Sequence, residues 1–161
     1  MNKKLIIILM PVLIVGAIGY YAISPLFHNI KLDEALPTAN TLVPKDIAKQ
    51  NTSNTEAPAI HSAGAVVGSP GHPASGTAQI VQADGKQYVR YENFKTINGP
   101  DIYVYLSKDL DAKDYISLGK VKATEGNINY EIPPEINVAD YKYVLTWCKT
   151  FGVLFNSAQI N

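Results

Sequence analysis

Residues 143–155 read YVLTWCKTFGVLF, and this aromatic and β-branched run predicts strand rather than helix. A period of two places alternate side chains on opposite faces of such a strand. One face is large and ends in a cation, and it carries Tyr143, Leu145, Trp147 and Lys149. The other face is small and mostly apolar, and it carries Val144, Thr146 and Cys148. A strand that is apolar on both faces is typical of the centre of a sheet, between two packed layers.

Short strands of the same kind fill the second half of the chain. They are predicted at residues 77–82, 87–94, 102–106, 115–121, 128–132, 143–148, 151–155 and 157–160. Turn signals separate them, among them Asp84-Gly85 and residues 98–101, where Gly99 can take a positive φ and Pro100 fixes φ. No ten-residue stretch with helical periodicity lies between them. The fold class is therefore all-β, and we expect an antiparallel β-sandwich with a jelly-roll-like form.

The N-terminal segment predicts a membrane anchor. Residues 5–23 are uncharged and mostly apolar, and as a helix they would be roughly 28 Å long, close to one bilayer core. Lys3 and Lys4 precede this run, which places the N-terminus in the cytoplasm and the rest of the chain outside. A cleaved signal peptide is the alternative, with Ala17 and Gly19 as its small residues. The apolar run continues beyond them, which favours an uncleaved single-pass anchor over residues 1–31 in the cell membrane.

Residues 32–71 differ in composition from the segments on either side. Ala, Thr, Ser, Asn, Pro and Gly dominate there, aromatic residues are absent, and no hydrophobic period persists. Such a composition predicts a flexible, disordered linker. The folded domain is then expected at residues 72–161, a length that can bury a modest core.

Charge and motifs exclude several functions. The 14 Lys and Arg residues balance the 14 Asp and Glu residues, so no basic surface for nucleic acid is expected. The sequence has no G-x-S-x-G elbow, no H-E-x-x-H motif and no Gly-rich phosphate loop. We therefore do not expect a self-sufficient enzyme.

Cys148 is the only cysteine of the chain, and His72 is the only histidine of the expected domain. Two such ligands are too few for a blue-copper site, a structural zinc site or an iron–sulfur cluster, so no metal site is predicted. Haem needs a single axial ligand, for which Cys148 and His72 are the candidates. A bare thiol that cycles through sulfenic acid or a mixed disulfide needs Cys148 alone. The number of available ligands therefore permits both haem and a bare thiol.

Each candidate residue also has a purely structural interpretation. A lone cysteine on an apolar strand is commonly inert packing, and a histidine between Gly71 and Pro73 is commonly a solvated turn residue. Asp101 would bond to its own turn, and Lys149 would point away from Cys148 in a regular strand.

Two further groups of residues are expected to be structural. The carboxylates of a predicted loop would be solvated rather than hold calcium, and these are Asp109, Asp111 and Asp114. The tyrosines would be packing rather than an electron relay, and these are Tyr88, Tyr91, Tyr103, Tyr105, Tyr130, Tyr141 and Tyr143.

Four blocks of the sequence resemble a known family. They are HPASGTAQIV, YENFKTINGPDIYVYL, ISLGKVKATEGNINYEIP and YVLTWCKTFGVLFNSAQI. In this order they resemble the Skeletor-type electron-transfer domain, the DM-thirteen domain, over residues 72–160. The resemblance implies a β-sandwich that accompanies haem-binding and cytochrome domains, with a motif cysteine proposed to transfer electrons. That cysteine corresponds to Cys148. Asn156 stands where the family often has glycine, a departure that asparagine's tolerance of positive φ makes small.

Two functions follow as hypotheses. In the first, a membrane-anchored extracytoplasmic domain takes part in electron transfer through Cys148, together with a redox protein partner. In the second, the domain is a non-catalytic binding or adhesion module in which Cys148 is structural. Sandwich folds host both kinds of function, so the fold alone does not choose between them.

Overall fold

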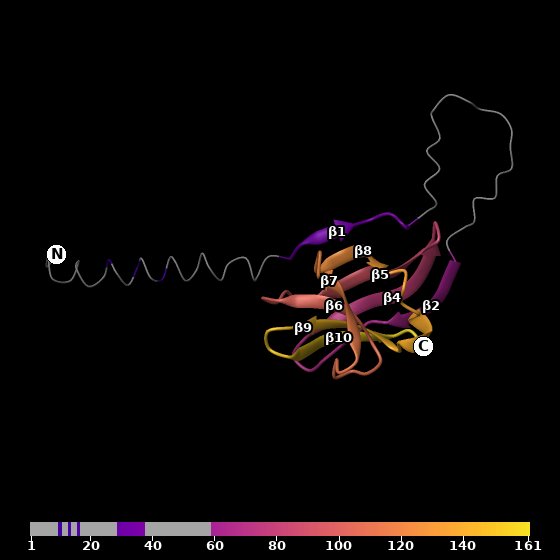
Figure 1. Cartoon of the computed structure of the whole chain (residues 1–161). Coiled ribbons are helices and arrows are strands. Elements are labelled where there is room, and N and C mark those ends of the chain that lie inside the picture. The colour runs from indigo at the N-terminus through magenta and orange to yellow at the C-terminus, as the bar shows by residue number, and fades with distance from the viewer. Residues whose placement is uncertain (1–9, 11–12, 14–15, 17–28, 38–58) are drawn as a thin grey trace, which may run out of the picture.

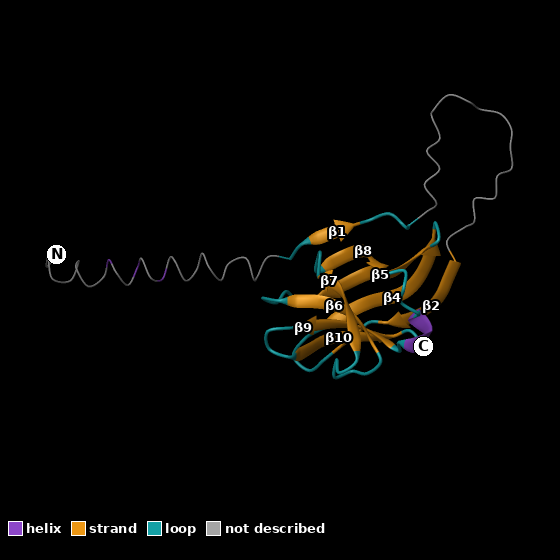
Figure 2. Cartoon of the chain, viewed as in Figure 1, coloured by secondary structure: helices purple, strands orange, loops and turns teal. Residues whose placement is uncertain are grey.

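Two five-stranded β-sheets make up the fold, as the computed structural model shows (Figures 1 and 2). The structure describes Met10, Leu13, Gly16 and residues 29–37 and 59–161. The first sheet has the order β1-β8-β5-β4-β2, formed by Lys31–Asp33, Glu125–Ile132, Lys86–Thr96, Ala74–Ala83 and Ala59–Ala65. The second has the order β3-β10-β9-β6-β7, formed by Val67–Gly68, Val153–Gln159, Tyr143–Cys148, Ile102–Ser107 and Tyr115–Lys120. A 3₁₀ turn, η2 (Val138–Asp140), precedes β9.

The two sheets pack face to face around one core. Alternate residues of each strand point inward, as the period of two requires. The first sheet contributes Ile80, Val89, Tyr91, Ile128 and Ile132, and the second contributes Val104, Leu106 and Val144. Each of these side chains is almost completely buried. The prediction of an all-β, mainly antiparallel sandwich is confirmed, with β1 as a parallel addition beside β8.

Three pairs of consecutive strands form hairpins, β4–β5 in the first sheet and β6–β7 and β9–β10 in the second. The β4–β5 turn is the expected one, because Asp84 and Gly85 have φ values of 53° and 69°, as in a type I′ hairpin turn.

The predicted strand at 143–148 is β9 itself, which lies between β10 and β6 in the middle of its sheet. The two strands predicted at 151–155 and 157–160 are wrong as separate elements, because β10 runs unbroken over Val153–Gln159. The pairing of β10 with β9 shifts register between Leu154 and Asn156, and the strand continues through this shift. Asn156 has no positive φ. It is buried, and its side-chain amide donates to Thr96 Oγ1 at 3.0 Å, which explains why asparagine suits this position.

Three strands fall inside the stretch that composition assigned to a flexible linker. β1, β2 and β3 all lie within or at the border of residues 32–71, and residues 38–58 lie outside the described residues. The pairing of an edge strand uses backbone groups, which small residues supply as well as large apolar ones. β2, for instance, pairs with β4 from Ala59↔Gln82 to Ala65↔Thr77. The folded part therefore begins before residue 72.

Segment 29–37 is held against the first sheet by a buried cation. Arg90 is 6% exposed, and its guanidinium donates to the carbonyl oxygens of Glu34 and Ala35 at 3.3 and 3.2 Å. It also donates to Asn129 Oδ1 at 2.9 Å and pairs with Glu92 at 2.8 Å. The chain around β1 is thus part of the domain rather than of a tether.

The predicted membrane span at residues 5–23 lies outside the described residues, except for Met10, Leu13 and Gly16. Among the residues that are described, no helix has the length and apolar character needed to cross a bilayer.

Gly64 marks a point where the two sheets touch. A Cβ at this position of β2 would lie 1.9 Å from the backbone oxygen of Gln159 in β10. We expect Gly64→Ala to lower the free energy of unfolding by about 3 kcal/mol, because backbone must shift to make room. Ala63→Val should change the free energy of unfolding by no more than about 0.5 kcal/mol, because Ala63 is exposed on the same strand. Equal urea midpoints for the two variants would contradict this close approach.

Candidate functional site

Cys148 ends the central strand β9. Its strand partners are Val153 in β10 and Ile102 in β6. The residue is 1% exposed and packs in a small cluster with Ile102 and Phe155. Its strand face is the one predicted from the sequence, shared with Val144 and Thr146. Thr146 Oγ1 lies 3.4 Å from the hydroxyl of Tyr91 in the opposite sheet, so this face is directed at the core.

A small cavity lies beside Cys148. Its volume is about 200 Å³, and its lining consists of His72, Pro100, Cys148, Phe151, Val153 and Phe155. The two residues singled out from the sequence, Cys148 and His72, therefore line the same cavity. The other four residues are apolar, and each lies in one of the sequence blocks that resemble the electron-transfer family, although none was singled out as a site residue. Phe151 is 68% exposed in the β9–β10 turn, and in sequence it follows Trp147 and Cys148 within the same block.

His72 is fixed in a tight turn rather than free in solvent. Its backbone N–H donates to Ser69 O at 2.9 Å, and Gly71 between them has a φ of 81°. Its ring lies against Phe155, with ring centroids 4.2 Å apart. The interpretation as a merely solvated turn histidine is therefore replaced by that of a packed ring at a cavity wall.

Hydrogen bonds at Nδ1 determine the form of the His72 ring. Nδ1 lies 3.1 Å from both Ser69 Oγ and the carbonyl oxygen of Pro70. The Ser69 hydroxyl donates its own proton to Leu154 O, so both partners of Nδ1 act as acceptors. A neutral His72 then carries its proton on Nδ1 and leaves the lone pair on Nε2. This arrangement is the one that orients an imidazole for use as a base or ligand through Nε2.

Asp101 and Lys149 connect the turns at this end of the sandwich. Asp101 Oδ2 accepts a hydrogen bond from Thr150 Oγ1 at 2.9 Å, and Asp101 O accepts from Lys149 N at 2.9 Å. Asp101 thus bonds across to the β9–β10 turn instead of to its own turn. The Lys149 ammonium lies 5.5 Å from the centre of the Tyr103 ring, on the face opposite Cys148, as the strand period predicted.

Gly99 is required for space rather than for a positive φ. A Cβ there would come within 2.8 Å of Phe155 Cζ and 3.0 Å of Ile102 Cγ2. The turn at 98–101 can thus lie close against the cluster that contains Cys148.

The acidic loop is internally bonded. The Asp109 carboxylate accepts the backbone N–H groups of Asp111, Lys113 and Asp114, and these bonds lower its pKa, that from Lys113 most. Asp111 and Asp114 form ion pairs with Lys113 and Lys108 at 2.9 Å each. Within residues 29–37 and 59–161, no three His, Cys, Asp or Glu side chains are grouped as metal ligands.

The tyrosines form two separate groups. Tyr91 stacks on Phe94 at 4.2 Å and meets Tyr130 edge-on at 6.1 Å inside the core. Tyr105 stacks on Tyr115 at 4.1 Å. Burial raises the pKa of Tyr130 to about 12. Burial, assisted by Tyr115, raises that of Tyr105 to about 12 as well.

These raised pKa values predict a loss of stability in alkali. An unfolded tyrosine titrates near pH 10, so between about pH 10 and 12 the folded chain holds protons that the unfolded chain releases. The contribution is complete below pH 10 and disappears as the pH rises through 12. We expect the urea midpoint to fall over this range, and to fall less steeply for Tyr130→Phe, which has one titrating group fewer. A midpoint that is independent of pH would contradict the burial of these hydroxyls.

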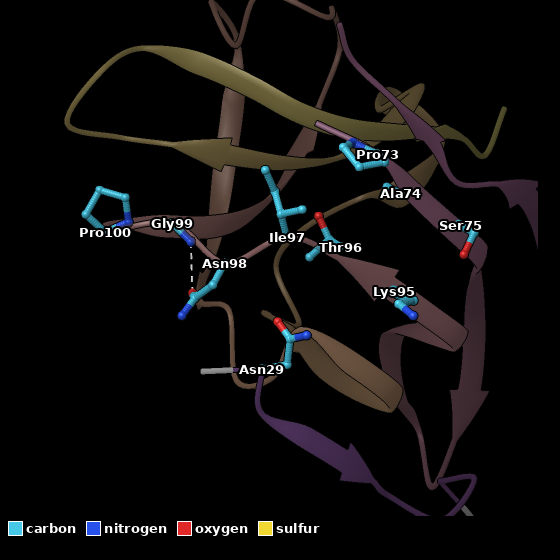
Figure 3. A pocket seen from close by; sticks show the side chains of 10 residues that line it. All are labelled: Asn29, Pro73, Ala74, Ser75, Lys95, Thr96, Ile97, Asn98, Gly99 and Pro100. Atoms are coloured by element: carbon cyan, nitrogen blue, oxygen red, sulfur yellow. Dashed lines mark hydrogen bonds between the residues drawn. The ribbon is translucent and has the colours of Figure 1, made fainter. Parts of the chain in front are cut away.

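The Cys148 cavity does not fit haem. Its volume of about 200 Å³ is below the 300–1,000 Å³ typical of sites for drug-sized ligands, and a haem macrocycle is at least that large. A larger cavity of about 630 Å³ lies nearby (Figure 3). It shares Pro100 with the small cavity, but neither Cys148 nor His72 lines it. Of the two redox alternatives, haem and the bare thiol, the cavity beside Cys148 has room only for the second.

Phe151 both lines the Cys148 cavity and is 68% exposed, which makes it the side chain to truncate in a test of access. We expect Phe151→Ala to increase the rate at which iodoacetamide modifies Cys148 by roughly tenfold, because the truncation widens the opening of the cavity. The rate is read from intact mass, which reports one site since the chain has one cysteine. Leu110→Ala is the matched control, because Leu110 is an exposed apolar residue in the β6–β7 loop. Equal rates for the two variants would show that reagents reach Cys148 by another route.

Comparison with known families agrees with the resemblance seen in the sequence. The family model described as electron transfer DM13 matches residues 67–160, and the match begins at β3. No curated protein and no solved structure matches the chain. The family match covers more than half of the 161 residues and includes β3–β10, His72 and Cys148. The chain belongs to the electron transfer DM13 family.

Proposed function

We propose that this protein is a membrane-anchored, extracytoplasmic electron-transfer protein in which the thiol of Cys148 is the redox-active group. Family membership supports a redox-related role. The observation that carries the assignment to Cys148 is the cavity that it shares with His72. Small molecules that enter this cavity would meet the lone thiol and an imidazole on the same wall.

The anchoring part of the proposal comes from the sequence. The apolar run at residues 5–23 is long enough to span a bilayer, and Lys3 and Lys4 precede it. These features favour a single-pass protein of the cell membrane with a cytoplasmic N-terminus and the sandwich on the other side. Its partners are then the membrane and a redox protein or small thiol, and the balanced charge gives no reason to expect nucleic acid.

The proposed chemistry is a two-electron cycle at sulfur. His72 Nε2 takes the proton of the Cys148 thiol, and the thiolate attacks one oxygen of a small hydroperoxide. An S–O bond forms while the O–O bond breaks, and the leaving alkoxide takes up a proton to become an alcohol, or water if the oxidant is hydrogen peroxide. Cys148 is then a sulfenic acid. Two thiols of a reductant restore it, with release of one disulfide and one water.

Trapping of the sulfenic acid tests this proposal. The full chain is treated with hydrogen peroxide in the presence of dimedone, which reacts with sulfenic acids and not with oxidised methionine. We expect one dimedone adduct on the native chain and none on Cys148→Ser. Addition of a thiol before the dimedone should remove the signal, and renewed peroxide should restore it. A native chain without an adduct would exclude this role for Cys148.

One observation favours the alternative function. Cys148 is 1% exposed and packs with Ile102 and Phe155, as an inert core cysteine would. In that case the domain is a non-catalytic binding or adhesion module. Cys148→Ala would then be as active in binding as the native chain, and the folded thiol would resist peroxide.

A further inference from the structure

One end of the sandwich gathers several connections. The start of β1, the β5–β6 connection and the β9–β10 turn lie together there (Figure 1). Hydrogen bonds hold this end together, since the backbone N–H groups of Thr124 and Glu125 both donate to Ile30 O, at 2.9 and 3.1 Å. Thr96 N at the end of β5 donates to Thr124 O at 2.9 Å. The first residues of the described domain are therefore fixed at this end.

Apolar side chains are exposed at the same end. Four of them form what we call the apolar rim, namely Ile30, Ile97, Phe151 and Val153, which are 55%, 37%, 68% and 36% exposed. Ile97 lines the larger cavity, together with Asn29 and Pro100 among others (Figure 3). Pro100 also lines the Cys148 cavity, together with Phe151 and Val153. Pro100 therefore joins the cavity lined by Ile97 to the cavity lined by Phe151 and Val153, and Ile30 follows Asn29 of the larger cavity directly in the chain.

The length of chain before β1 sets how far this end can lie from a bilayer. The apolar run ends at Ile23, and the first residue of the described domain is Asn29. Six residues in fully extended form span at most about 20 Å. Because segment 29–37 is bonded to the sheet through Arg90, no long tether lies between the apolar run and the domain.

We propose that the apolar rim rests on the phospholipid surface of the membrane in which residues 5–23 are anchored. A bilayer interface accommodates exposed aromatic and aliphatic side chains, which would otherwise face water. This orientation places the opening of the Cys148 cavity at the bilayer surface, since Phe151 belongs to both. The proposal rests on the membrane anchor given under the proposed function.

Depth-dependent quenching tests the orientation in the full chain. The chain is reconstituted in phosphatidylcholine liposomes that carry a shallow doxyl quencher, in a Trp147→Phe background, so that an introduced tryptophan is the only one. Phe151→Trp and Ile97→Trp report on the rim from two separate turns. Leu110→Trp is the matched control, because Leu110 is 42% exposed in the loop between β6 and β7, away from the rim.

We expect both rim tryptophans to be quenched at least about twice as strongly as the tryptophan at position 110, with blue-shifted emission. Equal, weak quenching at all three positions in a chain that floats with the liposomes would overturn the rim contact and leave the anchor intact. Failure of the chain to float with the liposomes would overturn both the rim contact and the anchor. Circular dichroism of each variant establishes that the sandwich is folded.

Discussion

Replacement of Arg90 by alanine is expected to lower the free energy of unfolding by about 3 kcal/mol, because a buried, multiply bonded cation is removed. The variant removes the guanidinium donor from the carbonyl oxygens of Glu34 and Ala35, of which Ala35 O keeps the Asn129 side-chain amide as a donor, and it breaks the contact with Asn129 Oδ1. Stability should be lost locally in segment 29–37 as well as in the whole domain. Hydrogen exchange at the amide of Glu34, which donates to Asn127 O at 2.7 Å, should become faster than that of the core strands.

Two variants sharpen this test. Arg90→Lys keeps the charge but cannot reproduce the planar fork of donors, so most of the loss should remain. Lys86→Ala removes another cation of the same strand. Its ion pair with Glu131 is half exposed, so no measurable change in the free energy of unfolding is expected. If Arg90→Ala left both the unfolding midpoint and the Glu34 exchange rate unchanged, segment 29–37 would not be docked as described.

The second large effect concerns His72. We expect His72→Phe to slow the reaction of Cys148 with hydrogen peroxide by roughly a hundredfold, since the proposed general base is lost. Phenylalanine keeps an aromatic ring against Phe155, where the His72 ring now lies with a centroid distance of 4.2 Å. The hydrogen bonds from Nδ1 to Ser69 and Pro70 disappear, and their loss should cost about 1 kcal/mol of stability.

The control for His72 is Lys149→Ala. Lys149 is the cation nearest to Cys148 in sequence, but its ammonium lies over Tyr103 on the other face of β9. Its removal should leave the peroxide rate unchanged, which separates a base in the cavity from a general effect of positive charge. A His72→Phe chain that reacts at the native rate would contradict a role for the imidazole.

The strands were predictable where side chains alternate and turns have strong local signals. β9 matches its predicted range, and the Asp84-Gly85 turn is as expected, because both depend on neighbouring residues alone. β1 and β2 were missed for a physical reason. β1 has only three residues and β2 is rich in Ala and Gly, and both are edge strands stabilised by backbone pairing with β8 and β4. The segment after β1 is held by the distant Arg90. No local pattern contains that information.

The site was predictable in its parts but not in its assembly. Cys148 and His72 were found because each is the only residue of its kind in the expected domain. Their meeting at one cavity depends on the turn from Ser69 to His72 and on Phe155, which packs against both. The small cavity volume, which decides against haem, is likewise a result of tertiary packing.

The most direct measurement of whether Cys148 is a redox centre is its rate of reaction with hydrogen peroxide in the folded chain and in the same chain unfolded by urea. Dimedone adducts on the single cysteine give both rates. The cavity and His72 predict a folded rate at least about tenfold above the unfolded one. A folded rate at least about tenfold below the unfolded one would identify Cys148 as inert packing in the core.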